Sequence, residues 1–137
     1  MAEKIMAKEA PSAVGPYSHA VVSGGMVYTS GQIPLTPDGG MAQGGISGQT
    51  HQAIKNLEAV LKASGASLSS VVKTTCFLTD MADFAAFNEV YAQYFTGKPA
   101  RSCVAVRALP KGVMVELEAI AECPNNIKKE RITHEDI

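Results

Sequence analysis

The chain has 137 residues, enough for one domain with a sizeable core and too few for two. Apolar residues make up 46%, and the formal net charge of −1 comes from mixed basic and acidic residues, which argues against the basic surface of a nucleic-acid-binding protein. Three cysteines without a Cys-x-x-Cys spacing argue against a disulfide scaffold or a structural zinc site, and the N-terminus lacks the apolar region of a signal peptide, so we expect a cytoplasmic protein.

The N-terminal third predicts a β-hairpin followed by a long loop. Residues 1–16 are expected to be an irregular lead-in, and strands are expected over residues 17–22 and 26–30, joined by a Ser-Gly-Gly turn. Residues 31–45 are rich in Gly and Pro and predict a loop. Loops of this length are uncommon in a small domain and are often functional.

The middle of the chain predicts two helices with a strand between them. Ser47 can cap a first helix whose apolar residues recur with the helical period, and Gly65 is expected just beyond its end. Residues 71–79 are rich in β-branched side chains and predict a largely buried strand. Asp80 or Asp83 is expected to start a second helix with aromatic residues along one side.

The C-terminal part predicts strands over residues 100–107 and 113–122, interpreted as a final hairpin. The resulting order β-β-α-β-α-β-β is typical of an α+β domain with both helices on one face of the sheet. Because the strands carry apolar residues on both faces, the uncovered face needs a partner, and we expect a homo-oligomer. Residues 1–123 would form the single domain and residues 124–137 a polar, charged tail.

The most informative residues are an arginine and two glutamates in these last strands. Arg101 lies in an apolar strand, where a charge is costly unless an anion meets it, and Glu116 and Glu118 share one face of the next strand. Two interpretations stay open. The first, favoured by the pattern alone, is a structural Arg–Glu pair that ties the two strands together. The second is a guanidinium that binds the carboxylate of a ligand and leaves a glutamate free to activate water.

Five further residues are candidates for a binding site, each with a plain structural alternative. Tyr17 can donate to a ligand or relay a proton, or it can be a half-buried aromatic residue. Ser30 and Gly31 offer a hydroxyl and an accessible backbone, or simply a turn. Asn88 can line a pocket or satisfy backbone groups, and Cys103 can be a pocket thiol or an inert buried cysteine. The histidines show no metal-ligand spacing, and no metal is expected.

Several motifs together resemble the Rid (YjgF) family, and within it the RidA subgroup. The resemblance runs from about Ala10 to Glu122 with the motifs in the expected order. They are Gly15-Pro16-Tyr17-Ser18, Thr29-Ser30-Gly31-Gln32-Ile33-Pro34, Val72-Lys73-Thr74-Thr75, Pro99-Ala100-Arg101-Ser102-Cys103, Leu109-Pro110-Lys111 and Val115-Glu116-Leu117-Glu118-Ala119-Ile120-Ala121.

The resemblance implies a chorismate-mutase-like fold assembled as a homotrimer, with three sheets packed into a central barrel and sites between subunits. It also implies an enamine/imine deaminase without a cofactor. Such an enzyme hydrolyses reactive 2-aminoacrylate and 2-iminobutanoate-type intermediates, released by pyridoxal-phosphate enzymes, to 2-ketoacids and ammonia. Three alternatives stay open. They are a module that binds small carboxylates such as 2-ketoacids without physiological catalysis, an RNA-directed translation inhibitor, and a chaperone-like protein that presents apolar surface.

The resemblance also implies roles for individual residues. Arg101 matches the arginine that binds the substrate carboxylate, Glu116 matches the residue that positions the attacking water, and Tyr17 is expected to relay a proton. The other residues that match substrate-binding positions are Ser30, Gly31, Asn88 and Cys103.

Overall fold

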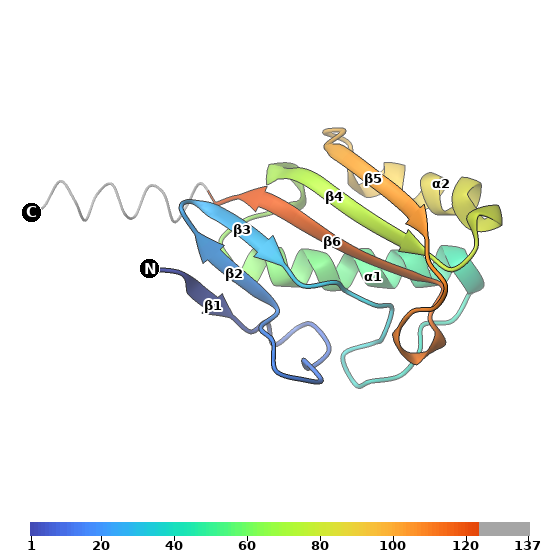
Figure 1. The fold of residues 1–137 in the computed structure, drawn as a ribbon, viewed down its shortest axis with the longest axis horizontal. Coiled ribbons are helices and arrows are strands. Elements are labelled where there is room, and N and C mark those ends of the chain that lie inside the picture. Colours follow the sequence, from blue (N-terminus) through green and yellow to red (C-terminus); the bar gives the residue numbers. More distant parts are fainter. Residues whose placement is uncertain (124–137) are drawn as a thin grey trace, which may run out of the picture.

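A computed structural model describes residues 1–123, and the predicted tail over residues 124–137 lies outside the described residues. The chain forms one six-stranded sheet in the order β1-β2-β3-β6-β4-β5, with both α-helices behind it (Figure 1). This arrangement confirms the α+β class, the mixed sheet and the two helices on one face. The elements are β1 (Glu3–Ile5), β2 (Ala20–Ser23), β3 (Met26–Thr29), α1 (Gly45–Ala63), η1 (Leu68–Ser70), β4 (Val71–Leu78), η2 (Met81–Asp83), α2 (Phe84–Tyr94), β5 (Ala100–Ala105), η3 (Pro110–Gly112) and β6 (Val115–Glu122).

The N-terminal half follows the prediction with shifted boundaries and one additional strand. The lead-in contains the short edge strand β1, paired with β2, where we expected no regular structure. The cap of α1 is Gly44, in a left-handed conformation, rather than Ser47. Gly65 follows the end of the helix with a φ of 83°, as its predicted place requires. The predicted loop is present, and its backbone meets the sheet where Gln32 pairs with Leu117.

The predicted C-terminal hairpin is wrong. β5 is an edge strand parallel to β4, and β6 lies antiparallel between β3 and β4 (Figure 1). The unit β4-α2-β5 is a strand–helix–strand crossover, which places consecutive strands parallel to each other. β6 takes a central place because one side of it is entirely apolar and buried, and a central strand has neighbours on both edges.

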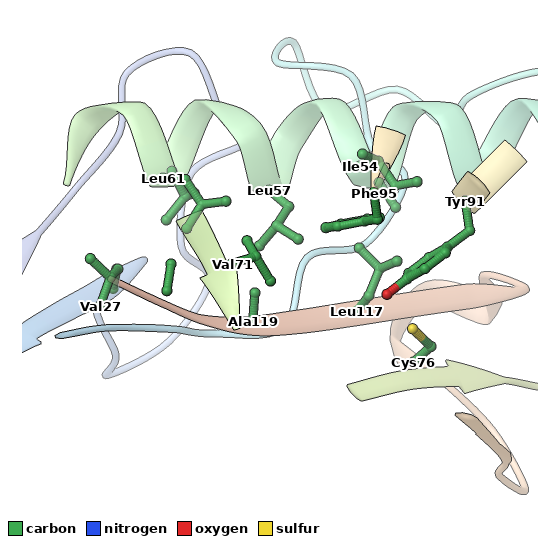
Figure 2. Packing of buried hydrophobic residues seen from close by; sticks show 14 of the residues in the cluster. Val27, Ile54, Leu57, Leu61, Val71, Cys76, Tyr91, Phe95, Leu117 and Ala119 are labelled. Carbon is green, nitrogen blue, oxygen red and sulfur yellow. The ribbon is translucent and has the colours of Figure 1, made fainter. Parts of the chain in front are cut away.

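The core lies between the helices and one face of the sheet. Ile54, Leu57 and Leu61 of α1 point toward Leu117 and Ala119 of β6, and all five side chains are buried (Figure 2). Each of the leucine and isoleucine side chains among them contributes roughly 1.5–3 kcal/mol when fully buried. Alternation along β6 therefore directs the intervening glutamates to the other face of the sheet.

That other face, called the open face below, keeps apolar side chains at its surface. Tyr28 of β3 and Val104 of β5 are 47% and 45% exposed. Their register partners on this face are Ile120 of β6 and Phe77 of β4, both partly buried. Exposed apolar side chains grouped on one face of a sheet are typical of a protein-interaction surface. Within the described part of the chain, no helix has the length and apolar character needed to cross a membrane.

Candidate functional site

Six of the seven residues predicted for a site separate into two groups on opposite faces of the sheet. The first lines a hollow that we call the glutamate cavity, and its predicted members are Tyr17, Ser30, Gly31 and Glu116. The second lines a shallower hollow beside α2 that we call the arginine pocket, and its predicted members are Asn88 and Arg101. The two hollows share no lining residue.

The glutamate cavity is formed where the long loop leaves β3 and passes over β6. Its volume is about 480 Å³. Glu116 projects from the open face of β6, and its carboxylate lies directly against the backbone of Gly31. A Cβ added at position 31 would overlap Glu116 Oε2, so only glycine leaves room for the carboxylate here. This close approach places a carboxylate and a backbone segment together in one wall of the cavity.

The protonation of Glu116 is tuned by its surroundings. Burial raises the pKa of the Glu116 carboxyl above its ordinary value, and the charge of Glu118 adds to the effect. Both causes disfavour the ionised form. A carboxyl group whose pKa is raised toward neutrality is better suited to exchange protons with a bound water or ligand than an exposed glutamate.

The opposite wall of the cavity is the segment that leads into β2. The Tyr17 ring is 49% exposed, and its hydroxyl accepts a bond from the Val14 amide over 3.3 Å. Ser30 Oγ donates to the Ser18 carbonyl over 2.6 Å, which fixes the end of β3 to this segment. Tyr17 thus lines the cavity at the protein surface, and the hydrogen bond of Ser30 stabilises the cavity wall behind Tyr17.

His19 is a structural part of this wall. Its Nδ1 accepts a bond from the Ala7 amide and its Nε2 lies 2.8 Å from the Pro11 carbonyl. An amide only donates and a carbonyl only accepts, so the imidazole is neutral with its proton on Nε2. The ring is buried and lines the cavity. His19 therefore holds residues 7–11 against the rest of the domain.

The arginine pocket lies at the sheet edge, between β5 and α2. Arg101 Nη1 donates to Asn88 Oδ1 over 2.7 Å, and the guanidinium carbon lies 4.8 Å from the centre of the Tyr91 ring and 5.5 Å from that of Phe84. The open structural alternative, an Arg–Glu pair, is wrong because Arg101 faces α2 whereas Glu116 faces away from it. Asn88 takes the place of the expected carboxylate partner.

Cys103 lines neither hollow and packs against the core, next to Cys76 in the register of β4 and β5. Burial raises the pKa of the Cys103 thiol, an effect that the charge of Arg101 partly offsets. The thiol therefore stays protonated at neutral pH, as expected for a packing residue rather than a nucleophile. Over residues 1–123, the structure brings together no three His, Cys, Asp or Glu side chains as a metal site.

The chain is similar to a known family over almost its whole described length. A family model described as Endoribonuclease L-PSP matches residues 7–123. Protein HMF1 of Saccharomyces cerevisiae is 52% identical over 118 residues, which cover 85% of this chain and 92% of that protein. The 2-iminobutanoate/2-iminopropanoate deaminase of Salmonella typhimurium is 45% identical over 125 residues, covering 88% of this chain and 98% of the deaminase.

The fold is also shared with solved structures. The crystal structure of Escherichia coli TdcF with bound serine matches this chain with a TM-score of 0.83 and 44% sequence identity. The match covers 88% of this chain and 98% of TdcF. At this level of identity the likeness extends beyond the fold to the family.

Proposed function

This chain belongs to the endoribonuclease L-PSP family, the YjgF/Rid family, and on that premise we propose that it is an enamine/imine deaminase. Its substrates would be 2-aminoacrylate and 2-iminobutanoate-type compounds, and its products 2-ketoacids and ammonia. The observation that carries the proposal is a pair of complementary half-sites. One presents a guanidinium with free donors for a carboxylate, and the other a carboxyl group with a raised pKa.

The separation of these half-sites supports a site made by two copies of the chain. Arg101 and Glu116 lie on opposite faces of one sheet, so a four-carbon ligand cannot touch both within a single chain. Arg101 lies on the edge strand β5, where a neighbouring copy can approach. In a closed ring, each copy would present its arginine pocket to the glutamate cavity of the next. We propose a homotrimer, with the apolar open faces packed together at its centre.

In this arrangement the reaction needs little covalent chemistry from the protein. An imine carbon is already electrophilic, so binding and orientation supply much of the rate. Arg101 would hold the substrate carboxylate through two parallel N–H···O bonds. Glu116 would accept a proton from a water molecule as the water oxygen bonds to the imine carbon, while the C=N double bond opens and its nitrogen takes up a proton. In the resulting carbinolamine the nitrogen takes up a second proton through Tyr17, the proposed relay, and leaves as ammonia when the C–N bond breaks. The hydroxyl group gives up its proton at the same time and becomes the ketone oxygen of the 2-ketoacid.

The other predicted residues have supporting parts in this proposal. Gly31 would bring its backbone close to the ligand, and Ser30 would stabilise the cavity wall. Asn88 would orient Arg101 rather than contact the ligand first, because its carbonyl oxygen already accepts from the guanidinium. Cys103 would contribute through the backbone of β5, since its thiol faces the core.

A second candidate function is a module that binds small carboxylates without catalysis. The TdcF structure with bound serine favours it, because serine carries the same carboxylate that Arg101 would bind. Such a module needs the arginine but has no need of a carboxyl group that positions water. The effect of replacing Glu116 therefore separates the two functions.

The direct test is ammonia release from 2-iminobutanoate generated in the assay by threonine dehydratase. We expect the wild-type protein to accelerate release and Arg101→Ala to lose most of the acceleration. Arg107→Ala, which removes an exposed arginine just beyond β5, is the matched control and should behave as wild type. Wild-type turnover in folded Arg101→Ala would contradict the assignment. No acceleration by the folded wild-type trimer would favour the carboxylate-binding module.

A further inference from the structure

We propose that Tyr91, anchored by Thr74, is a positioning residue for Arg101 and sets how tightly the arginine pocket binds a carboxylate. Neither residue stood out in the sequence as part of a site. The inference rests on the proposed function, because it takes Arg101 as the group that binds the substrate carboxylate. It assigns to α2 and β4 a part in ligand affinity that is separate from the chemistry at the glutamate cavity.

The Tyr91 ring contacts the guanidinium of Arg101. The guanidinium carbon of Arg101 lies 4.8 Å from the ring centre, within the range of a cation–π interaction. Asn88 Oδ1 accepts a hydrogen bond from Nη1, at one edge of the planar guanidinium. A guanidinium that rests on a ring and is bonded at one edge has few orientations left. Its remaining N–H donors are then directed away from α2, where a planar carboxylate can meet two of them.

Tyr91 is itself fixed by two contacts. Its hydroxyl lies 2.7 Å from Thr74 Oγ1, and Thr74 is completely buried. Its ring stacks on Phe95 with centroids 4.3 Å apart. Burial raises the pKa of the Tyr91 hydroxyl, so the group stays protonated and the bond to Thr74 persists through neutral pH. The ring that supports Arg101 is therefore held from two sides.

Thr74 lies beside Arg101 in the sheet. Thr74 is the register partner of Arg101 across β4 and β5. The three residues thus form a closed set of contacts. β5 carries the arginine, α2 carries the ring that supports it, and β4 carries the hydroxyl that fixes the ring. A side chain that is already held in its bound orientation loses less conformational freedom when the ligand arrives. Weakening these contacts should therefore reduce the affinity for the carboxylate ligand more than the rate of the chemical step.

The test measures the binding of 2-oxobutanoate by calorimetry, together with kcat and KM for the imine, in the full-length protein. Tyr91→Leu removes the ring, and we expect an affinity about tenfold weaker, the scale of a partly buried cation–π contact. Tyr91→Phe and Thr74→Val break the same hydrogen bond, so each should weaken binding about two- to threefold, and the double variant should lose no more than either one. Throughout this series we expect KM to rise while kcat changes little.

Tyr94 provides a matched control on the same helix. Its hydroxyl bonds to His51 over 2.8 Å, away from the guanidinium. Tyr94→Leu should lower thermal stability and leave the 2-oxobutanoate affinity unchanged. A readout independent of affinity is the NMR signal of the Arg101 side-chain N–H, identified by its loss in Arg101→Lys. The ring at position 91 shifts this signal, so Tyr91→Phe should keep the wild-type shift, whereas Tyr91→Leu, which leaves only the ring of Phe84 near the guanidinium, should change it.

Unchanged affinity in every folded Tyr91 and Thr74 variant would overturn the inference, and Arg101→Ala shows whether the proposed function falls with it. If Arg101→Ala abolishes 2-oxobutanoate binding while these variants bind normally, the proposed function stands and only the positioning role is lost. If Arg101→Ala binds as tightly as wild type, both are contradicted. Should Tyr91→Leu fail to fold, the comparison of Tyr91→Phe and Thr74→Val with wild type decides the question.

Discussion

At the scale of single residues, the glutamate cavity depends on a glycine at position 31. Gly31 is needed because the Glu116 carboxylate occupies the space where any Cβ would lie. The motif containing Gly31 was visible in the sequence, but its physical reason was not, because the contact joins residues that are far apart along the chain. A glycine that a side chain approaches so closely is sensitive to the smallest substitution.

We predict that Gly31→Ala displaces the Glu116 carboxylate and lowers kcat about 100-fold, as expected when a reacting group moves by about 1 Å. Because the glycine lies at the rim of the sheet, the fold should persist. Deaminase kinetics and circular dichroism check the two parts of the prediction. Gly97→Ala is the matched control, since its Cβ would meet nothing within 4 Å and its activity should be that of wild type. Full activity in Gly31→Ala would show that the place of Glu116 does not matter.

The pair of glutamates leads to a prediction about pH. Burial and the charge of Glu118 raise the pKa of Glu116, so Glu116 takes up its proton at a higher pH than an ordinary glutamate as the solution is acidified. If the ionised form positions water, kcat/KM falls as pH drops through this raised pKa. Glu118→Gln removes one of the two causes and should move that acidic limb to lower pH. The pH profiles of the two proteins test this, and identical acidic limbs would exclude an electrostatic role for Glu118.

At the scale of elements, the sequence predicted most helices and strands correctly but paired the last strands wrongly. Both helices, the long loop and strands near their observed bounds follow from apolar periodicity and from Gly and Pro positions. The hairpin assigned to β5 and β6 assumed that consecutive strands are neighbours. The strand–helix–strand order of β4, α2 and β5 was the signal that could have corrected it, since it predicts a parallel pair.

This error in pairing explains which parts of the site could be predicted. Residue types and motifs identified Arg101, Glu116 and Gly31 as candidates, because their chemistry is unusual for the places they occupy. Their relative position depends on strand order, which local patterns do not encode. The contact of Tyr91 with Arg101 was not predicted, because an aromatic residue on a helix is ordinary in a core and its partner Thr74 lies on another element.

The N-terminal segment provides a test at the level of elements. His19 joins the Ala7 amide and the Pro11 carbonyl, so His19→Ala should free residues 7–11, which supply part of the cavity wall. Leaving these buried groups unpaired costs about 1–3 kcal/mol in the free energy of unfolding. Hydrogen exchange of the Ala7 amide should accelerate, and thermal unfolding should occur earlier. His51→Ala, at a histidine of α1 that hydrogen-bonds to Tyr94 of α2, is the control and should leave the Ala7 amide protected. Unchanged hydrogen exchange of the Ala7 amide in His19→Ala would contradict the role of His19 in holding residues 7–11.

At the scale of the whole molecule, a single copy of the described chain lacks two features that the proposed deaminase needs. Exposed apolar side chains on its open face have no cover within residues 1–123, and its two half-sites lie on opposite faces of the sheet. A closed ring of copies would resolve both at once, because each interface would bury part of the open face and join an arginine pocket to a glutamate cavity. Assembly and catalysis would then be inseparable, and a single copy would bind its ligand weakly and turn it over poorly.

The measurement that tests this account most directly is deaminase activity in mixed assemblies of Arg101→Ala and Glu116→Gln chains, refolded together at equal concentration. Each variant alone should be nearly inactive and should have three times the mass of one chain by light scattering. If every site takes its arginine from one copy and its glutamate from the next, random mixing leaves about a quarter of the sites intact. We therefore predict about a quarter of wild-type activity in the mixture. A mixture no more active than its parents, with the same mass, would contradict a site shared between copies.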